Sequence, residues 1–232
     1  KAQKLKIPIY SYPEYIYKQS KNKKRIVIGG SHGKTSITAM ILHVLRNQNI
    51  DCDYLVGAQL HGFDTMVKLS DAPLIVLEGD EYLSSPIDKR PKFHLYKPHI
   101  GVISGIAWDH INVFPTFENY VNQFRIFKNT VSEQLIYCNE DKELSKLMLE
   151  KTKCEIIDYG TPEHKIINGV TSIDNCDLKI FGRHNLQNLN AAMLVCMQLG
   201  IDKKSFINEI KNFKGASNRL ELISNEKDFS IY

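Results

Sequence analysis

The feature that most constrains the fold is a short apolar run that ends in glycines and leads directly into an amphipathic segment. Residues 25–30 read Arg-Ile-Val-Ile-Gly-Gly, which is typical of a buried parallel strand. Apolar residues then recur at helical spacing from Lys34 to Asn47. A strand, a glycine-rich loop and a helix in this order predict the opening of a βαβ unit.

The loop between that strand and that helix has the composition of a phosphate-binding loop. Its residues are Gly30, Ser31, His32, Gly33, Lys34, Thr35 and Ser36. Glycines allow a tight turn that points backbone N–H groups at an anion, Lys34 adds a positive charge, and Thr35 offers a hydroxyl to Mg²⁺. The general pattern has a further glycine where this chain has Ile28, so the loop is a shortened form. The alternative is a glycine-rich turn with Lys34 in solvent.

Strands and helices continue to alternate after this unit. We expect strands at residues 74–78, 100–104, 134–138 and 155–159, and helices at 117–131 and 141–149. This alternation predicts an α/β fold, in which helices cover both faces of a mostly parallel sheet of the P-loop type.

The two ends of the chain show other patterns. Residues 165–181 predict a small antiparallel edge sheet, followed by helices at 184–199 and 203–212 and by strands at 220–223 and 229–232. Residues 7–12 predict a short strand or loop, Pro13 a turn, and residues 18–25 a solvated basic linker.

Charge and cysteine content exclude several classes of protein. The 232 residues include 30 basic and 26 acidic side chains, and the only concentrated basic run is the linker at 18–25, which argues against a nucleic-acid partner. The five cysteines lack the spacing of a zinc site and fit reduced thiols in the cytoplasm. No apolar run approaches the roughly 20 residues of a membrane span, so we expect no membrane partner.

Acidic residues and a histidine follow two of the predicted strands. Because ligands of open α/β sheets gather at the carboxyl ends of the strands, Glu78 can hold Mg²⁺ beside Thr35, and His110 can hold a second Mg²⁺ or Mn²⁺. Asp80 and Glu81 are left open as ligands. The predicted metal ligands are Thr35, Glu78 and His110, and the predicted catalytic residues are Lys34, Glu78 and His110.

These stretches resemble the Mur ligases, the ATP-dependent ligases of peptidoglycan synthesis. The resemblance rests on residues 30–35 (Gly-Ser-His-Gly-Lys-Thr), 78–81 (Glu-Gly-Asp-Glu), 109–110 (Asp-His), 182–188 (Gly-Arg-His-Asn-Leu-Gln-Asn) and 218–221 (Asn-Arg-Leu-Glu). The segments occur in the family's order across nearly the whole chain, and the shortened loop together with the 182–188 segment is specific.

The resemblance implies roles for individual residues. Lys34 and the loop amides would hold the phosphates of ATP, Thr35 and Glu78 one Mg²⁺, and Glu78 and His110 a second. The contacts to adenine or ribose would come from His184, Asn185 and Asn188, and a contact to the phosphates from Arg219. In the family, ATP converts a substrate carboxylate to an acyl phosphate, which an amine attacks to give an amide, ADP and phosphate.

The sequence departs from the family pattern at two places. The family usually carries Asn four residues before the aspartate of Asp-His, where this chain has Gly105. Several relatives also have a lysine on the following helix that becomes carbamoylated; the nearest match here is Phe124, as in branches without that lysine.

Within the family the resemblance is strongest to the murein peptide ligase branch, because residues 80–82 (Asp-Glu-Tyr) and 88–93 (Asp-Lys-Arg-Pro-Lys-Phe) look like stretches of that branch. This implies a cytoplasmic enzyme that joins a murein tripeptide to UDP-N-acetylmuramate in peptidoglycan recycling. One alternative is the branch that adds L-alanine. An alternative of another class is a nucleotide-binding switch module without ligase chemistry.

The resemblance also implies a division of the chain. We expect residues 1–24 to be a remnant of an N-terminal UDP-binding domain with its linker, residues 25–219 the central ATP-binding domain, and residues 220–232 the start of a C-terminal domain. On that reading the chain by itself lacks ligase turnover.

Overall fold

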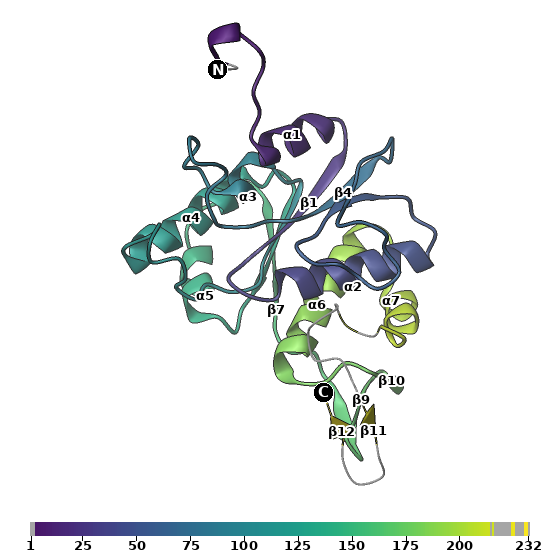
Figure 1. The fold of residues 1–232 in the computed structure, drawn as a ribbon. Helices are drawn as coiled ribbons and strands as arrows, with labels where there is room; N and C mark the ends of the chain where they lie inside the picture. Colours follow the sequence, from purple (N-terminus) through teal and green to yellow (C-terminus); the bar gives the residue numbers. More distant parts are fainter. Residues whose placement is uncertain (1–2, 214, 216–223, 226–229, 232) are drawn as a thin grey trace.

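A seven-stranded sheet forms the centre of the computed structural model, which describes residues 3–213, 215, 224–225 and 230–231 (Figure 1). Its strands are β1 (Lys24–Gly29), β2 (Asp53–Leu55), β3 (Val67–Lys68), β4 (Leu74–Glu78), β5 (Ile100–Ile103), β6 (Gln134–Cys138) and β7 (Glu155–Tyr159). They lie in the order β3-β2-β4-β1-β5-β6-β7, and all neighbours are parallel except β2 and β3. The predicted mostly parallel sheet is therefore confirmed.

Helices cover both faces of this sheet, as the alternation predicts. One face carries α2 (Lys34–Asn47), α6 (Arg183–Gln198) and α7 (Lys203–Ile210). The other carries α1 (Tyr12–Gln19), α3 (Lys92–Leu95), α4 (Phe117–Thr130) and α5 (Lys142–Met148). A 3₁₀ helix, η1 (Gln3–Leu5), precedes α1.

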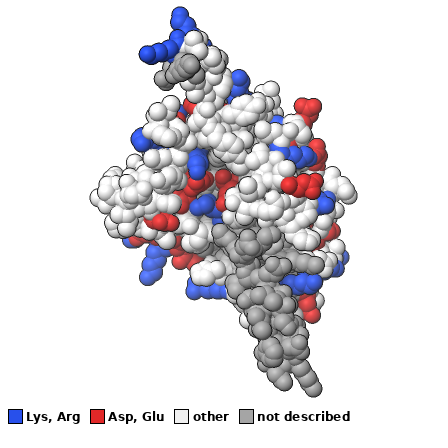
Figure 2. Space-filling model, viewed as in Figure 1, with Lys and Arg blue, Asp and Glu red and all other residues white. Residues whose placement is uncertain are grey.

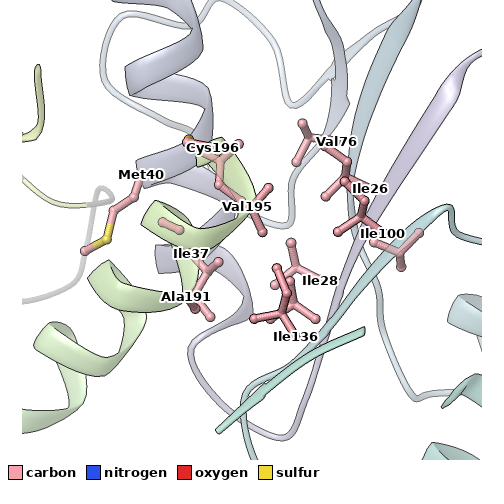
Figure 3. Close-up of a cluster of buried hydrophobic side chains, with 14 of the residues drawn as sticks. Ile26, Ile28, Ile37, Met40, Val76, Ile100, Ile136, Ala191, Val195 and Cys196 are labelled. Carbon is pink, nitrogen blue, oxygen red and sulfur yellow. The ribbon is translucent and has the colours of Figure 1, made fainter. Parts of the chain in front are cut away.

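The core between the sheet and the α2–α6 face is made of interdigitated aliphatic side chains (Figure 3). Ile26 and Ile28 of β1 are fully buried, and so are Ile37 of α2 and Val195 of α6. Each such side chain contributes about 1.5–3 kcal/mol through its removal from water. Because β1 and α2 both lie in this core, the loop that joins them is anchored at both ends.

Smaller antiparallel sheets lie beside α6 and α7 in Figure 1. The first contains β8 (Lys165–Ile167), β9 (Val170–Ile173) and β10 (Cys176–Leu178), and the second contains β11 (Ser224–Asn225) and β12 (Ser230–Ile231). The prediction of a small antiparallel sheet at 165–181 is confirmed, although it forms a sheet of its own. The strand expected at 220–223 lies outside the described residues.

The loop expected at residues 7–12 extends to Ser11, but the turn expected at Pro13 was wrong, because α1 begins at Tyr12. Ser11 caps this helix, and its side chain accepts a hydrogen bond from the Glu14 backbone while the Glu14 carboxylate accepts one from the Ser11 backbone. Pro13 lies in the first turn, where a missing N–H costs no hydrogen bond. The short elements β2, β3 and α3 were also not predicted, since each has too few residues for a periodic pattern.

The basic segment was expected to be solvated, and two of its cations are instead buried or paired. Lys23 donates to Asp53, which is fully buried, over 2.5 Å. Arg25 is 7% exposed and donates to five backbone oxygens. Those oxygens belong to Ser20, Lys21, Lys23, Tyr96 and Lys97, so Arg25 joins the end of α1 to the segment after α3.

Within the described part of the chain, no helix has the length and apolar character needed to cross a bilayer.

We expect Arg25→Met to lower the free energy of unfolding by about 2–4 kcal/mol, because it removes charge-assisted hydrogen bonds and leaves buried carbonyls without donors. Urea denaturation followed by circular dichroism measures the loss. Arg125→Met is the matched control, since Arg125 pairs with Glu150 at the surface, and its loss should stay under about 1 kcal/mol. Equal losses in the two variants would contradict the bridging role of Arg25.

Candidate functional site

The glycine-rich loop lies at the carboxyl ends of the parallel strands, between β1 and α2. Gly30 has φ 130° and Gly33 has φ 75°, conformations that side chains rarely adopt. Ser104, just after β5, holds the loop by donating from its backbone N–H to Gly29 O over 3.1 Å and from its hydroxyl to His32 O. The turn is therefore pinned to the end of a neighbouring strand.

Lys34, the first residue of α2, forms an ion pair with a buried carboxylate. Its Nζ lies 2.7 Å from Glu81 Oε2 and 2.6 Å from Gly30 O. Glu81 is 1% exposed and also accepts a hydrogen bond from the Tyr120 hydroxyl over 3.2 Å. The hydroxyls of Tyr120 and Ser31 lie 2.9 Å apart, so the network returns to the loop. Burial raises the pKa of Tyr120 well above its usual value, and the phenol stays protonated.

A second carboxylate faces Thr35. Glu78 Oε1 accepts from the Thr35 hydroxyl over 2.9 Å, and Glu78 Oε2 accepts from the backbone of Gly57 over 2.8 Å. Thr35 is buried at 5% exposure and Glu78 is half-buried. A hydroxyl and a carboxylate in contact, at the first turn of the helix that carries Lys34, supply the oxygen ligands that Mg²⁺ prefers.

His110 lies beside Glu81 rather than in the Thr35–Glu78 pair. Its Nε2 is 3.8 Å from Glu81 Oε1, and its Nδ1 is 3.8 Å from Asp109 Oδ1. Its backbone φ is 79°, an unusual value for histidine. Among the described residues, Asp80, Glu81 and His110 offer ligand atoms that all lie within 4.8 Å of one another.

Both groups fit the hard divalent cation that the sequence predicts, because they consist of carboxylate and hydroxyl oxygens with one imidazole. The structure brings Thr35 and Glu78 together and gives His110 a different carboxylate neighbour. Glu81, which the sequence analysis left open, therefore joins the candidate ligands.

The start of α6 meets the glycine loop from a distant part of the sequence. Asn188 is 8% exposed, and a β-carbon at Gly33 would overlap its amide oxygen. The rings of His184 and His32 lie 6.1 Å apart, and Asn185 donates to Phe181 O. Burial lowers the pKa of His32, and the charge of His184 lowers it further. Arg219 lies outside the described residues.

The same end of α6 has an ionic contact that the sequence analysis did not identify. Glu140, in the turn after β6, accepts from Arg183 Nε over 3.0 Å and from Gln187 Nε2 over 2.9 Å. Its pKa falls to about 2, because the hydrogen bond from Arg183 favours the ionised form. In the sequence, the only indication of a role for Glu140 was its position just after a predicted strand.

Tyr120 was not identified from the sequence either, because it belongs to the apolar stripe of α4.

The space beside the α-carbon of Gly105 is filled by the His32 ring of the loop. A β-carbon there would overlap the imidazole of His32 and would lie 3.3 Å from Asp141 Oδ2. The backbone of Gly105 also accepts a hydrogen bond from Ser31 N over 3.0 Å. The space of the missing side chain is thus filled by His32 of the loop.

Charged groups of both signs surround the loop. Figure 2 shows acidic and basic side chains meeting near the centre of the face in view. The arrangement offers cations and backbone amides for phosphates and carboxylates for metal ions, which suits a nucleotide bound with divalent cations.

Comparison with known proteins gives consistent matches. Residues 28–196 match the family profile described as the Mur ligase middle domain. The UDP-N-acetylmuramate–L-alanine ligase of Clostridium tetani is 29% identical over 245 residues, which cover 97% of this chain and 52% of that protein. The ligase of the same name from Endomicrobium trichonymphae is 30% identical over 240 residues, with 95% and 52% covered. The chain spans about half the length of the curated relatives it matches.

Solved structures share the fold. A UDP-N-acetylmuramate:L-alanyl-gamma-D-glutamyl-meso-diaminopimelate ligase from Neisseria meningitides superposes with a TM-score of 0.81 at 22% identity, covering 92% of this chain and 73% of that one. A murein peptide ligase from Psychrobacter arcticus gives 0.79 at 20% identity, covering 99% and 55%. At these identities the matches establish the fold alone.

We expect Gly30→Ala to lower the free energy of unfolding by about 3 kcal/mol, because φ is 130° and the new β-carbon would lie 2.9 Å from the backbone N of Ser104. Gly169→Ala is the matched control: φ is 78° there and no atom lies within 4 Å, so the loss should be about 1 kcal/mol. Urea denaturation measures both. A loss at Gly30 no larger than at Gly169 would show that the loop is not held closely against Ser104.

Proposed function

Because this chain belongs to the Mur ligase family, whose members are ATP-dependent, ADP-forming ligases, we propose that it forms the ATP-binding part of an enzyme that makes an amide bond. The observation that carries the proposal is the convergence of Lys34, Thr35–Glu78 and Asn188 on one glycine loop. These groups come from three separate segments of the chain. A structural turn between a strand and a helix has no need of them.

The residue roles proposed here are those that the family resemblance implies, and the convergence supports the ones that lie at the loop. Lys34 and the backbone N–H groups of residues 30–36 hold the phosphates. Thr35 and Glu78 hold one Mg²⁺, and Glu78 and His110 hold a second, with Glu81 beside His110. The metal ions, when bound, neutralise the charge that spreads over the phosphate oxygens during transfer. His184, Asn185 and Asn188 bind the nucleoside, and Arg219 contacts the phosphates.

Lys34 has to exchange partners when the nucleotide binds. In the structure its ammonium contacts Glu81 and Gly30 O, so reaching a phosphate breaks the ion pair with Glu81. Glu81 keeps its hydrogen bond from Tyr120 and the nearby imidazole of His110. Without Lys34, the buried carboxylate of Glu81 has lost its cationic partner. Because a buried charge without a partner is costly, the binding of a metal ion beside Glu81 becomes favourable.

The proposed reaction has two steps. A carboxylate oxygen of the acid substrate attacks the terminal phosphorus, and the bond from that phosphorus to ADP breaks. The amine then attacks the acyl carbon, loses a proton and expels phosphate, which leaves an amide. In the first step Lys34 stays on the transferring phosphoryl group and compensates its charge.

We propose UDP-N-acetylmuramate as the acid and a murein tripeptide as the amine, in peptidoglycan recycling in the cytoplasm. This rests on residues 80–82 and 88–93, whose sequence resembles the murein peptide ligase branch. L-alanine is the second candidate amine, because the curated relatives above are L-alanine ligases.

Lys34→Met should weaken the binding of ATP in the presence of Mg²⁺ by about 100-fold or more, because it removes the cation beside the phosphates. Isothermal titration calorimetry on the chain measures the dissociation constant. Lys146→Met is the control: Lys146 is an exposed lysine that pairs with Glu143 at the surface, and the affinity of this variant should match wild type. An unchanged affinity in Lys34→Met would refute the assignment of the loop.

The amine is tested in the full natural protein by ADP release with UDP-N-acetylmuramate and either L-alanyl-γ-D-glutamyl-meso-diaminopimelate or L-alanine. We expect kcat/KM for the tripeptide to exceed that for L-alanine by about 100-fold or more. The reverse order would assign the enzyme to L-alanine. Nucleotide binding without ADP release with either amine would instead favour a switch module.

A further inference from the structure

A cavity borders the phosphate loop, and most of its lining residues have no role assigned above. Its volume is about 390 Å³, and it is lined by Tyr12, Lys34, Leu55, Val56, Gly57, Glu78, Asp80, Lys92 and Tyr96. Lys34 and Glu78 form one wall, so the cavity borders the place where the terminal phosphate would lie. Tyr12, Lys92 and Tyr96, from α1, α3 and the residue after α3, form the other wall.

The cavity has free hydrogen-bond donors beside two carboxylates that already accept hydrogen bonds. Both oxygens of Glu78 accept hydrogen bonds, from Thr35 and Gly57. Both oxygens of Asp80 do so as well, from Tyr82 N over 3.1 Å and from Lys92 Nζ over 2.5 Å. Lys92 has two further N–H groups, which can donate to a ligand in the cavity.

Tyr96 is a largely buried tyrosine that lines the cavity. The residue is 1% exposed, lines the cavity, and its hydroxyl makes no hydrogen bond with any residue that the structure describes. Burial raises its pKa strongly, and Tyr12 and Asp80, which line the same cavity, raise it further, so the hydroxyl remains a donor. The Tyr12 hydroxyl also has no partner within the described residues, and burial raises its pKa as well. Tyr12 is 50% exposed, so both phenols are free to donate to an acceptor that enters the cavity.

The ion pair between Lys92 and Asp80 can be opened at small cost. The two side chains are 30% and 37% exposed, whereas Lys34 and Glu81 are 16% and 2% exposed. Half-exposed pairs contribute little to stability, so an incoming anion can take Lys92 from Asp80. The backbones are nevertheless fixed to each other, because Lys92 N donates to Tyr82 O and Phe93 N donates to Asp80 O.

The order of the strands separates this cavity from the start of α6, where the nucleoside is proposed to bind. The cavity lies over the ends of β2 and β4, on one side of β1. The start of α6 lies on the other side, where Arg183 pairs with Glu140 after β6 and Asn190 donates to Gly160 O after β7. A nucleotide that runs from α6 to the loop therefore ends at Lys34, and the cavity is the next space along that line.

We propose that Lys92, Tyr96 and Tyr12 bind the carboxylate of the acid substrate, the group that receives the phosphoryl. The inference rests on the proposed ligase function and adds residues that select and orient the acid. A carboxylate there accepts from the two phenols and from Lys92, and lies beside the phosphoryl group held by Lys34. Asp80 then holds the ammonium of Lys92 in place until the acid arrives.

The test uses the full natural protein with Lys92→Met, Tyr96→Phe and Lys68→Met. Lys68 is the matched control, because it forms a partly exposed pair with Asp51 over 2.7 Å at the β3 edge of the sheet. We expect the KM for UDP-N-acetylmuramate to rise about tenfold or more in Lys92→Met and about threefold or more in Tyr96→Phe. The KM for ATP should stay within about twofold in all variants, and both values should be unchanged in Lys68→Met.

A competitor identifies the part of the acid that Lys92 recognises. UDP-N-acetylglucosamine has the same nucleotide and amino sugar without the lactyl carboxylate, so its inhibition constant should be equal in wild type and Lys92→Met. An unchanged KM for the acid in Lys92→Met would overturn the inference, and so would an equal rise in the KM for ATP. The inference would also be overturned if UDP-N-acetylglucosamine inhibited Lys92→Met more weakly by the same factor by which the KM for the acid rises. Wild type without ADP release would overturn the proposed function itself, which distinguishes the two failures.

Discussion

The arrangement of the candidate site depends on one buried carboxylate, that of Glu81. A buried charge is tolerated only with partners, and here they come from different elements: Lys34 at the start of α2, Tyr120 of α4 and His110 of the loop after β5. Satisfying this one charge draws the phosphate loop, the end of β4 and α4 together. The Tyr120–Ser31 contact then extends the network back into the loop.

Lys34 and Lys92 each form an ion pair with a carboxylate, and the two pairs differ in how deeply that carboxylate is buried. Lys34 pairs with a carboxylate that is almost completely buried, and Lys92 pairs with one that is more than a third exposed. If Lys34 leaves Glu81 for a phosphate, the buried charge of Glu81 needs another cation, so the proposed function couples nucleotide binding to metal binding. Water compensates Asp80 when Lys92 leaves, so the second exchange is independent of the first.

Much of the fold could be predicted, because β1, α2 and the later strands have periodic patterns long enough to identify. The failures were local. Pro13 was expected to mark a turn, since proline breaks a helix in most positions, yet the Ser11–Glu14 capping box makes it a first-turn residue of α1. Lys23 and Arg25 looked like solvated cations, because their partners, Asp53 and the carbonyls near Tyr96, are distant in sequence.

The sequence by itself determined the family, the α/β fold and the loop of residues 30–36, because these depend on local spacing and on short motifs. The tertiary structure decided which side chains each carboxylate of the site contacts. Glu78 and Glu81 are three positions apart and chemically alike, but only the path of the chain after β4 sends one to Thr35 and the other to Lys34 and His110. The cavity around Lys92 likewise depends on the packing of α1 and α3 against the end of β4, a long-range arrangement that no local pattern encodes.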